Sequence, residues 1–169
     1  AAGGAFQAPL YQFPFWGFFA VPIGAVALGI AQGAVDTRMD IAQGRGGSGR
    51  PELHRDRPTF QAKLGESVAL LRAGRAWLHA AVEQAWDATV SRGSASLPER
   101  TDLLLAGTHA THTAATVVRM VYTEAGGGAN YRRSPLQRAL RDIHAATQSG
   151  RIGSRRQVGC YLGNLLHGP

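Results

Sequence analysis

The residues best suited to chemistry lie in one stretch, Gly126 to Ser149, which reads GGGANYRRSPLQRALRDIHAATQS. Three glycines come first, and glycine lets the backbone approach a ligand closely. Ser134 and Pro135 then form a strong helix start, followed by polar and basic residues. Backbone N–H groups and arginines converge at such a junction, which suits a phosphate-bearing ligand. A plain helix connection with solvated arginines is the alternative interpretation.

Other residue types give weaker indications. His109 and His112 share a helical face, but no Asp or Glu has a spacing that would complete a ligand set, so we predict no metal site. The single cysteine, Cys160, excludes an internal disulfide and fits a reducing compartment, so we expect a cytoplasmic protein. The sequence contains no P-loop, no CxxC and no Ser-His-Asp order.

The elements that must position these residues are all predicted to be helical, because no segment shows a sustained period of two. We expect an all-α, antiparallel four-helix bundle with a short additional C-terminal helix. The expected helices cover 17–43, 58–93, 96 to the glycine run, 134–149 and 154–166. Ser96 and Glu99 form a capping box at the third start. The apolar stripe of the second helix is expected to contain Leu64, Val68, Leu71, the stem of Arg75, Leu78, Val82 and Trp86.

The N-terminal third raises the question of a membrane, since no charged residue precedes Asp36. The run 15–31 is nearly long enough to span a bilayer, which takes roughly 17–25 residues. Its glycines and Pro22 weaken a helix in water, and a signal peptide would need a charged start that is missing here. We expect a fully buried core helix. A membrane-associated protein anchored by residues 15–31 is the alternative.

Length and net charge limit the number of domains and the kinds of partner that we expect. The chain has 169 residues and a formal net charge of +7, and its first residue is Ala1. We therefore expect one domain that is processed or cut from a longer protein, with 1–16 as an N-terminal extension or interdomain linker and 17–169 as the bundle. The arginines are spread along the chain without interleaved aromatics, so we expect no nucleic-acid partner. A non-catalytic basic helical scaffold is a further alternative.

Three segments carry a resemblance to a known family: ALGIAQGAVD, RPTFQAKLGES and GGGANYRRSPLQRALRDIHAATQ. With them, the chain from Ala25 to Leu166 resembles the C-terminal helical domain of the acyl-CoA dehydrogenase superfamily. It most resembles the branch of two-component flavin-dependent monooxygenases. The family consists of an N-terminal helical domain, a central β-barrel and a C-terminal four-helix bundle. The resemblance implies a flavin-dependent oxidoreductase that is inactive without the two domains this chain does not resemble.

The resemblance also implies a site and partners. In the family, FAD or FMN lies between barrel and bundle and touches the bundle of a neighbouring subunit, so a homodimer or homotetramer is implied. The implied substrate is a small aromatic compound or an acyl thioester. Flavin contacts carried over from the family motifs are Arg50, Gln61, Gly127, Gly128 and Arg138.

The catalytic position departs from the family pattern. A glutamate base in the dehydrogenases, or a histidine in the monooxygenase branch, follows the Arg-Asp pair that matches Arg141 and Asp142. Here that position is Ser149, and serine has no suitable pKa for general-base work. His144 lies close by in the sequence and is the candidate substitute. We predict His144 and Ser149 as the catalytic residues, with Arg141 and Asp142 in a structural ion-pair network.

Overall fold

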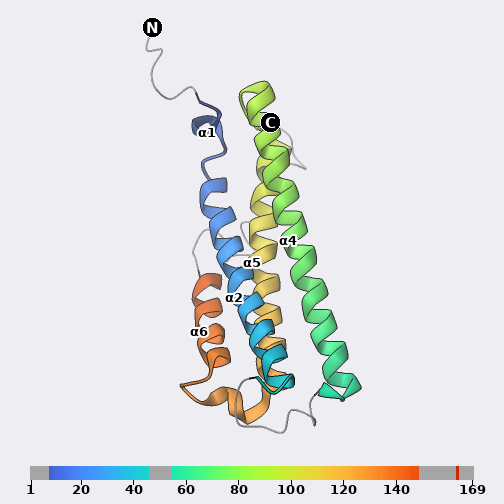
Figure 1. The fold of residues 1–169 in the computed structure, drawn as a ribbon. Coiled ribbons are helices and arrows are strands. Elements are labelled where there is room, and N and C mark those ends of the chain that lie inside the picture. Colours follow the sequence, from blue (N-terminus) through green and yellow to red (C-terminus); the bar gives the residue numbers. More distant parts are fainter. Residues whose placement is uncertain (1–7, 46–54, 149–162, 164–169) are drawn as a thin grey trace.

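The computed structural model describes residues 8–45, 55–148 and 163, and no β-strand occurs among them. The elements are α1 (Pro9–Gln12), α2 (Gly17–Ala42), α4 (Pro58–Arg92), α5 (Leu97–Ala125), the 3₁₀ helix η1 (Gly126–Asn130) and α6 (Pro135–Thr147). Figure 1 shows α2 and α5 running in one direction and α4 and α6 in the other. The prediction of an all-α antiparallel bundle is confirmed. The expected helix over 154–166 lies outside the described residues, apart from Gly163.

Local sequence rules explain where the helices begin and end. Pro58 and Pro135 lie at the first helical positions, where a missing N–H is tolerated. At the end of α4, Gly93 adopts φ 79°, a left-handed conformation that favours glycine. The predicted helix ends therefore differ from the observed ones by only one or two residues.

The predicted capping box at the start of α5 is confirmed. The backbone N–H of Ser96 donates to the Glu99 carboxylate at 2.7 Å, and Arg92 donates to both Glu99 oxygens at 2.7 Å. These bonds, first those from Arg92 and then those from Ser96, lower the pKa of Glu99 from 4.5 to about 2. The Glu99 carboxylate thus ties the end of α4 to the start of α5.

The core depends on small residues between α2 and α5. A Cβ added at Gly107 would lie 2.8 Å from the Ala20 carbonyl oxygen, and one added at Gly24 would lie 3.1 Å from the Gly107 carbonyl oxygen. The two helices thus approach through backbone and alanine. Fully buried residues along this contact are Ala20, Ala27, Ala31, Val35, Leu103, Ala106, Ala110, Ala114 and Val117.

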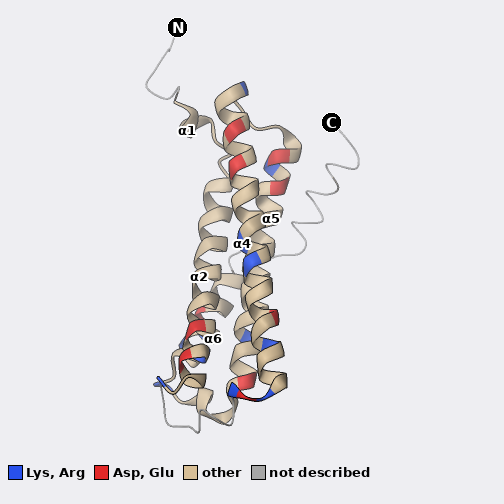
Figure 2. Cartoon of the chain, turned by 45° about the vertical axis from the view of Figure 1, so that its right-hand side comes forward, with Lys and Arg blue, Asp and Glu red and all other residues tan. Residues whose placement is uncertain are grey.

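The expectation that the first long helix is fully buried is wrong, because α2 packs through one face only. Phe18, Phe19 and Val26 on its other face are 45%, 48% and 60% exposed. By length and composition α2 could cross a membrane, and 39% of its most apolar window is buried in the bundle. Core helices of soluble proteins meet the same criterion, so this is weak evidence for a span. Figure 2 shows that the charged residues of α2 lie in its C-terminal half.

Candidate functional site

Residues from distant parts of the sequence lie at the same end of the bundle. Here α2 and α5 end, and α4, η1 and α6 begin (Figure 1). Gln61 lies in the first turn of α4, Gly127 and Gly128 lie in η1, and Arg138 lies in the first turn of α6. The topology therefore brings four of the five predicted flavin contacts to the same end. The fifth, Arg50, lies outside the described residues.

The glycine turn is open on the outside and anchored underneath. Gly126 adopts φ 65° and ψ −158°, which requires glycine and ends α5. Gly127 and Gly128 are exposed, and a Cβ on either would meet no atom within 4 Å. Buried Ala129 anchors the turn, and the Tyr122 hydroxyl donates a hydrogen bond to the Asn130 side chain. The surroundings at 127 and 128 thus leave room for a ligand against the backbone.

Polar side chains at the starts of α4 and α6 lie at the same end of the bundle as this turn. The Gln61 amide donates to the Arg55 carbonyl oxygen at 3.0 Å, which fixes its orientation at the start of α4. Arg138 contacts Asp142 at 3.5 Å, with side-chain exposures of 79% and 50%. An ion pair this exposed is weak, so it leaves the guanidinium available to a stronger anion. We predicted an ion-pair network with Arg141 and Asp142, but the partner that the structure gives Asp142 is Arg138, one helical turn away, and Arg141 is exposed.

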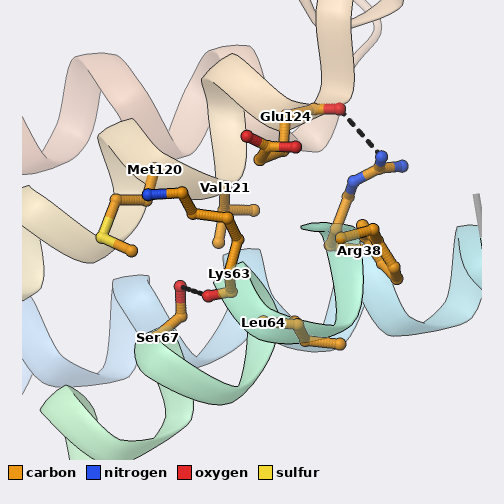
Figure 3. A pocket seen from close by; sticks show the side chains of 8 residues that line it. Arg38, Lys63, Leu64, Ser67, Met120, Val121 and Glu124 are labelled. Atoms are coloured by element: carbon orange, nitrogen blue, oxygen red, sulfur yellow. Dashed lines mark hydrogen bonds between the residues drawn. The ribbon is translucent and has the colours of Figure 1, made fainter. Parts of the chain in front are cut away.

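Sequence reasoning missed a buried cation beneath this end. Arg38 of α2 is 3% exposed and donates through Nη2 to the Glu124 carbonyl oxygen at 2.9 Å (Figure 3). Its guanidinium lies 4.8 Å from the centre of the Phe60 ring. Burial lowers the pKa of Arg38, and Glu124 raises it in part, yet arginine keeps its charge. Its spacing could have revealed it, because Arg38 continues the buried positions Ala31 and Val35 at helical intervals.

The described part of the predicted catalytic pair is His144 in α6. Its Nδ1 donates to the Leu140 carbonyl oxygen at 2.8 Å, because a carbonyl can only accept. In the neutral ring, that bond places the proton on Nδ1 and leaves the lone pair on Nε2, which is the tautomer required of a proton acceptor. The side chain is exposed, so Nε2 is accessible to a ligand. Ser149 lies outside the described residues.

Three other histidines lie in the described part of α4 and α5: His79 and His109 are exposed, whereas His112 is half-buried and its Nε2 is buried without a hydrogen-bond partner. The His109 ring lies 5.0 Å from that of Trp77, and its Nε2 is 3.2 Å from the Thr113 hydroxyl. Trp77 in turn donates to Asp102 at 3.1 Å. Within residues 8–45 and 55–148, no three His, Cys, Asp or Glu side chains form a group suited to a metal ion.

A separate apolar pocket lies at the other end of the bundle, with a volume of about 250 Å³. It lies where α1 and the start of α2 meet the C-terminal part of α4. The residues that line it are all apolar: Leu10, Phe13, Gly17, Phe18, Val21, Pro22, Val82 and Trp86. This pocket contains no polar group that could orient a ligand, and it is far along the bundle from the glycine turn.

Comparison with known families identifies the domain. Residues 21–149 match the family model described as acyl-CoA dehydrogenase, C-terminal domain. This match covers more than half of the chain, so the chain belongs to that family.

Individual relatives agree with the family assignment. The chain is 25% identical over 146 residues to indole-3-acetate monooxygenase of Acinetobacter baumannii, covering 86% of this chain and 37% of that protein. It is 29% identical over 136 residues to a pigment production hydroxylase of Rhodococcus erythropolis, covering 80% and 34%. The chain thus spans little more than a third of the length of these relatives.

Solved structures share the fold. The 3-HSA hydroxylase of Rhodococcus sp. RHA1 superposes with a TM-score of 0.82 at 23% identity, over 96% of this chain and 41% of that one. The HsaA monooxygenase of M. tuberculosis superposes with a TM-score of 0.82 at 20% identity, over 95% and 41%. At these identities the comparison establishes the fold of the bundle.

Proposed function

We propose that this chain is the C-terminal, flavin-supporting domain of a flavin-dependent monooxygenase that acts on a small aromatic substrate. The family membership and the activities named for two relatives support this assignment. Because the chain spans 37% and 34% of those relatives, we propose that an N-terminal helical domain and a β-barrel belong to the same functional protein. The observation that carries the proposal is the open glycine turn, which lies at the same end as Gln61 and Arg138.

The residues at this end are suited to a flavin dinucleotide. Gly127 and Gly128 would allow close approach of a diphosphate, and Arg138 would supply positive charge beside it. This arrangement favours FAD over FMN, because FMN has no diphosphate. When bound and reduced, a flavin supplies the redox chemistry that activates dioxygen for insertion of one oxygen atom into an aromatic ring.

His144 is the proposed general base of the domain. With its proton fixed on Nδ1 by Leu140, Nε2 can accept the proton of a phenolic or heteroaromatic substrate. Ser149 would orient the substrate by hydrogen bonding, since a serine hydroxyl does not take a proton at neutral pH. We expect turnover to be slower than in an enzyme with a histidine at position 149.

Turnover of the complete protein on a phenolic substrate tests this assignment. His144→Ala should lower turnover on the order of 10²-fold, and Ser149→His should raise it by a similar factor. His79→Ala is the matched control, because His79 is also an exposed helical histidine but lies on α4. Unchanged turnover in both His144→Ala and Ser149→His would show that neither position takes part in catalysis. Oxidation of an acyl thioester without oxygen insertion would favour dehydrogenase chemistry instead.

We also propose that the protein assembles as a homodimer or homotetramer through apolar surface of this domain. Its exposed large apolar residues near the start of the bundle support this: Leu10, Tyr11, Phe15, Trp16, Phe18, Phe19 and Val26. Analytical ultracentrifugation at micromolar concentration should show at least a dimer without detergent. A monodisperse monomer would contradict the proposal, and a requirement for detergent would favour the membrane-associated alternative.

A further inference from the structure

We propose that Arg38 is a positioning residue that holds the glycine turn in register with Gln61 and thereby sets the affinity of this end of the bundle for flavin. The inference rests on the proposed function for its ligand. Its geometric part concerns Arg38, Glu124 and the turn, and it can be tested without a ligand.

The first contact of Arg38 controls where the chain leaves α5. The Glu124 carbonyl is one of the last four of this helix, which have no partner within the helix. Arg38 Nη2 donates to it at 2.9 Å, and Glu124 precedes Gly126 by two residues. A charged donor from α2 therefore fixes the residue from which the glycine turn departs.

The second contact reaches the start of α4. The Arg38 guanidinium lies 4.8 Å from the centre of the Phe60 ring, and Phe60 is itself only 5% exposed. Phe60 immediately precedes Gln61, so its position determines where the Gln61 side chain begins. A single buried guanidinium thus contacts Glu124, two residues before the glycine turn, and Phe60, the residue before Gln61, as Figure 3 shows for the Glu124 side.

The surroundings of Arg38 support a specific role. Burying a guanidinium is unfavourable unless its contacts compensate, and an apolar side chain of similar length would fill the same space. Methionine would preserve much of the packing, but it could not donate to the Glu124 carbonyl oxygen. Burial lowers the pKa of Arg38 and the Glu124 carboxylate raises it in part, while nearby Lys63 pairs with Glu66 at 3.6 Å on the surface. Arginine at this position therefore contributes the hydrogen bond to the Glu124 carbonyl oxygen, at the end of α5 from which the glycine turn departs.

Amide hydrogen exchange of this chain tests the geometric part. In Arg38→Met, amides of Gly126–Asn130 should exchange about tenfold faster, the factor expected for loss of one charged hydrogen bond. Arg38→Lys should recover part of the protection. Arg72→Met, an exposed arginine on α4, is the control and should leave the turn unchanged. A uniform increase across all helices, or no change in the turn, would overturn the role of Arg38.

Titration of the complete protein with FAD tests the consequence. Arg38→Met should raise the Kd for FAD about tenfold and leave the KM for an aromatic substrate unchanged, whereas Arg72→Met should change neither. If Arg38→Met does not fold, Phe60→Leu removes the ring contact alone and should weaken FAD binding in the same direction. Equal affinity in folded variants and parent would overturn the inference. Failure of the parent to bind FAD would refute the proposed function, while hydrogen exchange would still decide whether Arg38 holds the turn.

Discussion

The contact between α2 and α5 predicts that Gly107→Ala destabilises the bundle. In the middle of a helix, replacing glycine by alanine normally stabilises a protein by up to about 1 kcal/mol. At position 107, however, the new methyl group would lie 2.8 Å from the Ala20 carbonyl oxygen and 3.0 Å from the Ala20 Cβ. The clashing oxygen belongs to the backbone, so it cannot move away without shifting α2.

The two effects can be compared in magnitude. Overpacking of a well-filled core costs about 1–3 kcal/mol, and a clash with backbone belongs at the upper end of that range. Subtracting the gain in helix propensity leaves a net loss of about 2 kcal/mol in the free energy of unfolding. For a chain of this size, that loss corresponds to a fall in Tm of about 4–8 °C.

Gly65→Ala is the matched control, because Gly65 lies inside α4 and a Cβ there would meet nothing within 4 Å. Urea unfolding followed by circular dichroism should give a lower midpoint for Gly107→Ala and an equal or higher midpoint for Gly65→Ala. If both variants were at least as stable as the parent, the close approach of α2 and α5 would be refuted.

Two further stability predictions follow from buried and charged groups. The pKa of Glu99 falls from 4.5 to about 2 on folding, so its stabilising contribution is complete above pH 4.5 and is lost as pH falls toward 2. Unfolding curves recorded at successive pH values should therefore show a smaller loss of stability over that interval for Glu99→Gln than for the parent. An unchanged pH dependence would contradict the pairing with Arg92. Leu103 is fully buried, so Leu103→Ala should lower the free energy of unfolding by about 2–5 kcal/mol. Leu97 is 46% exposed, so Leu97→Ala should have a much smaller effect in the same assay. Similar losses in the two variants would contradict the described core.

The type and ends of the helices could be predicted from sequence because local chemistry determines them. Pro58, Gly93 and the Ser96–Glu99 box act over a few residues, so tertiary contacts did not alter their effect. The turn after α5 was placed correctly for the same reason, although its 3₁₀ form and the four-residue helix α1 were not anticipated.

The buried face of α4 was predicted less well. Arg75 and Trp86 were expected in its apolar stripe, but both are exposed. The face that packs in the bundle is formed largely by small residues together with leucines, namely Ser67, Leu71, Gly74, Leu78, Ala81, Ala85 and Ala88. Side-chain size favours tryptophan for the core, whereas the close approach of these helices selects alanine and glycine. The predicted stripe therefore overlaps the buried face only in part: Leu71 and Leu78 are buried, and Leu64, Val68 and Val82 are half-buried at its edge.

The burial of Arg38 could not be predicted from residue type, because a charge in an amphipathic helix is normally assigned to the surface. Its burial depends on the Glu124 carbonyl oxygen and the Phe60 ring, which come from positions distant in sequence. The position of Gln61, Gly127 and Arg138 at the same end of the bundle follows from the antiparallel order of the helices.

Flavin affinity measured by fluorescence quenching, for this chain alone and for the complete protein, tests the central claim most directly. In the proposed function, the chain would supply the glycine turn, Gln61 and Arg138 to the flavin site, and the proposed barrel would supply the rest. The account predicts that the chain alone folds as a helical bundle and binds FAD weakly, and that the complete protein binds FAD tightly. Submicromolar FAD binding by the isolated chain, or failure of the complete protein to bind FAD, would contradict it.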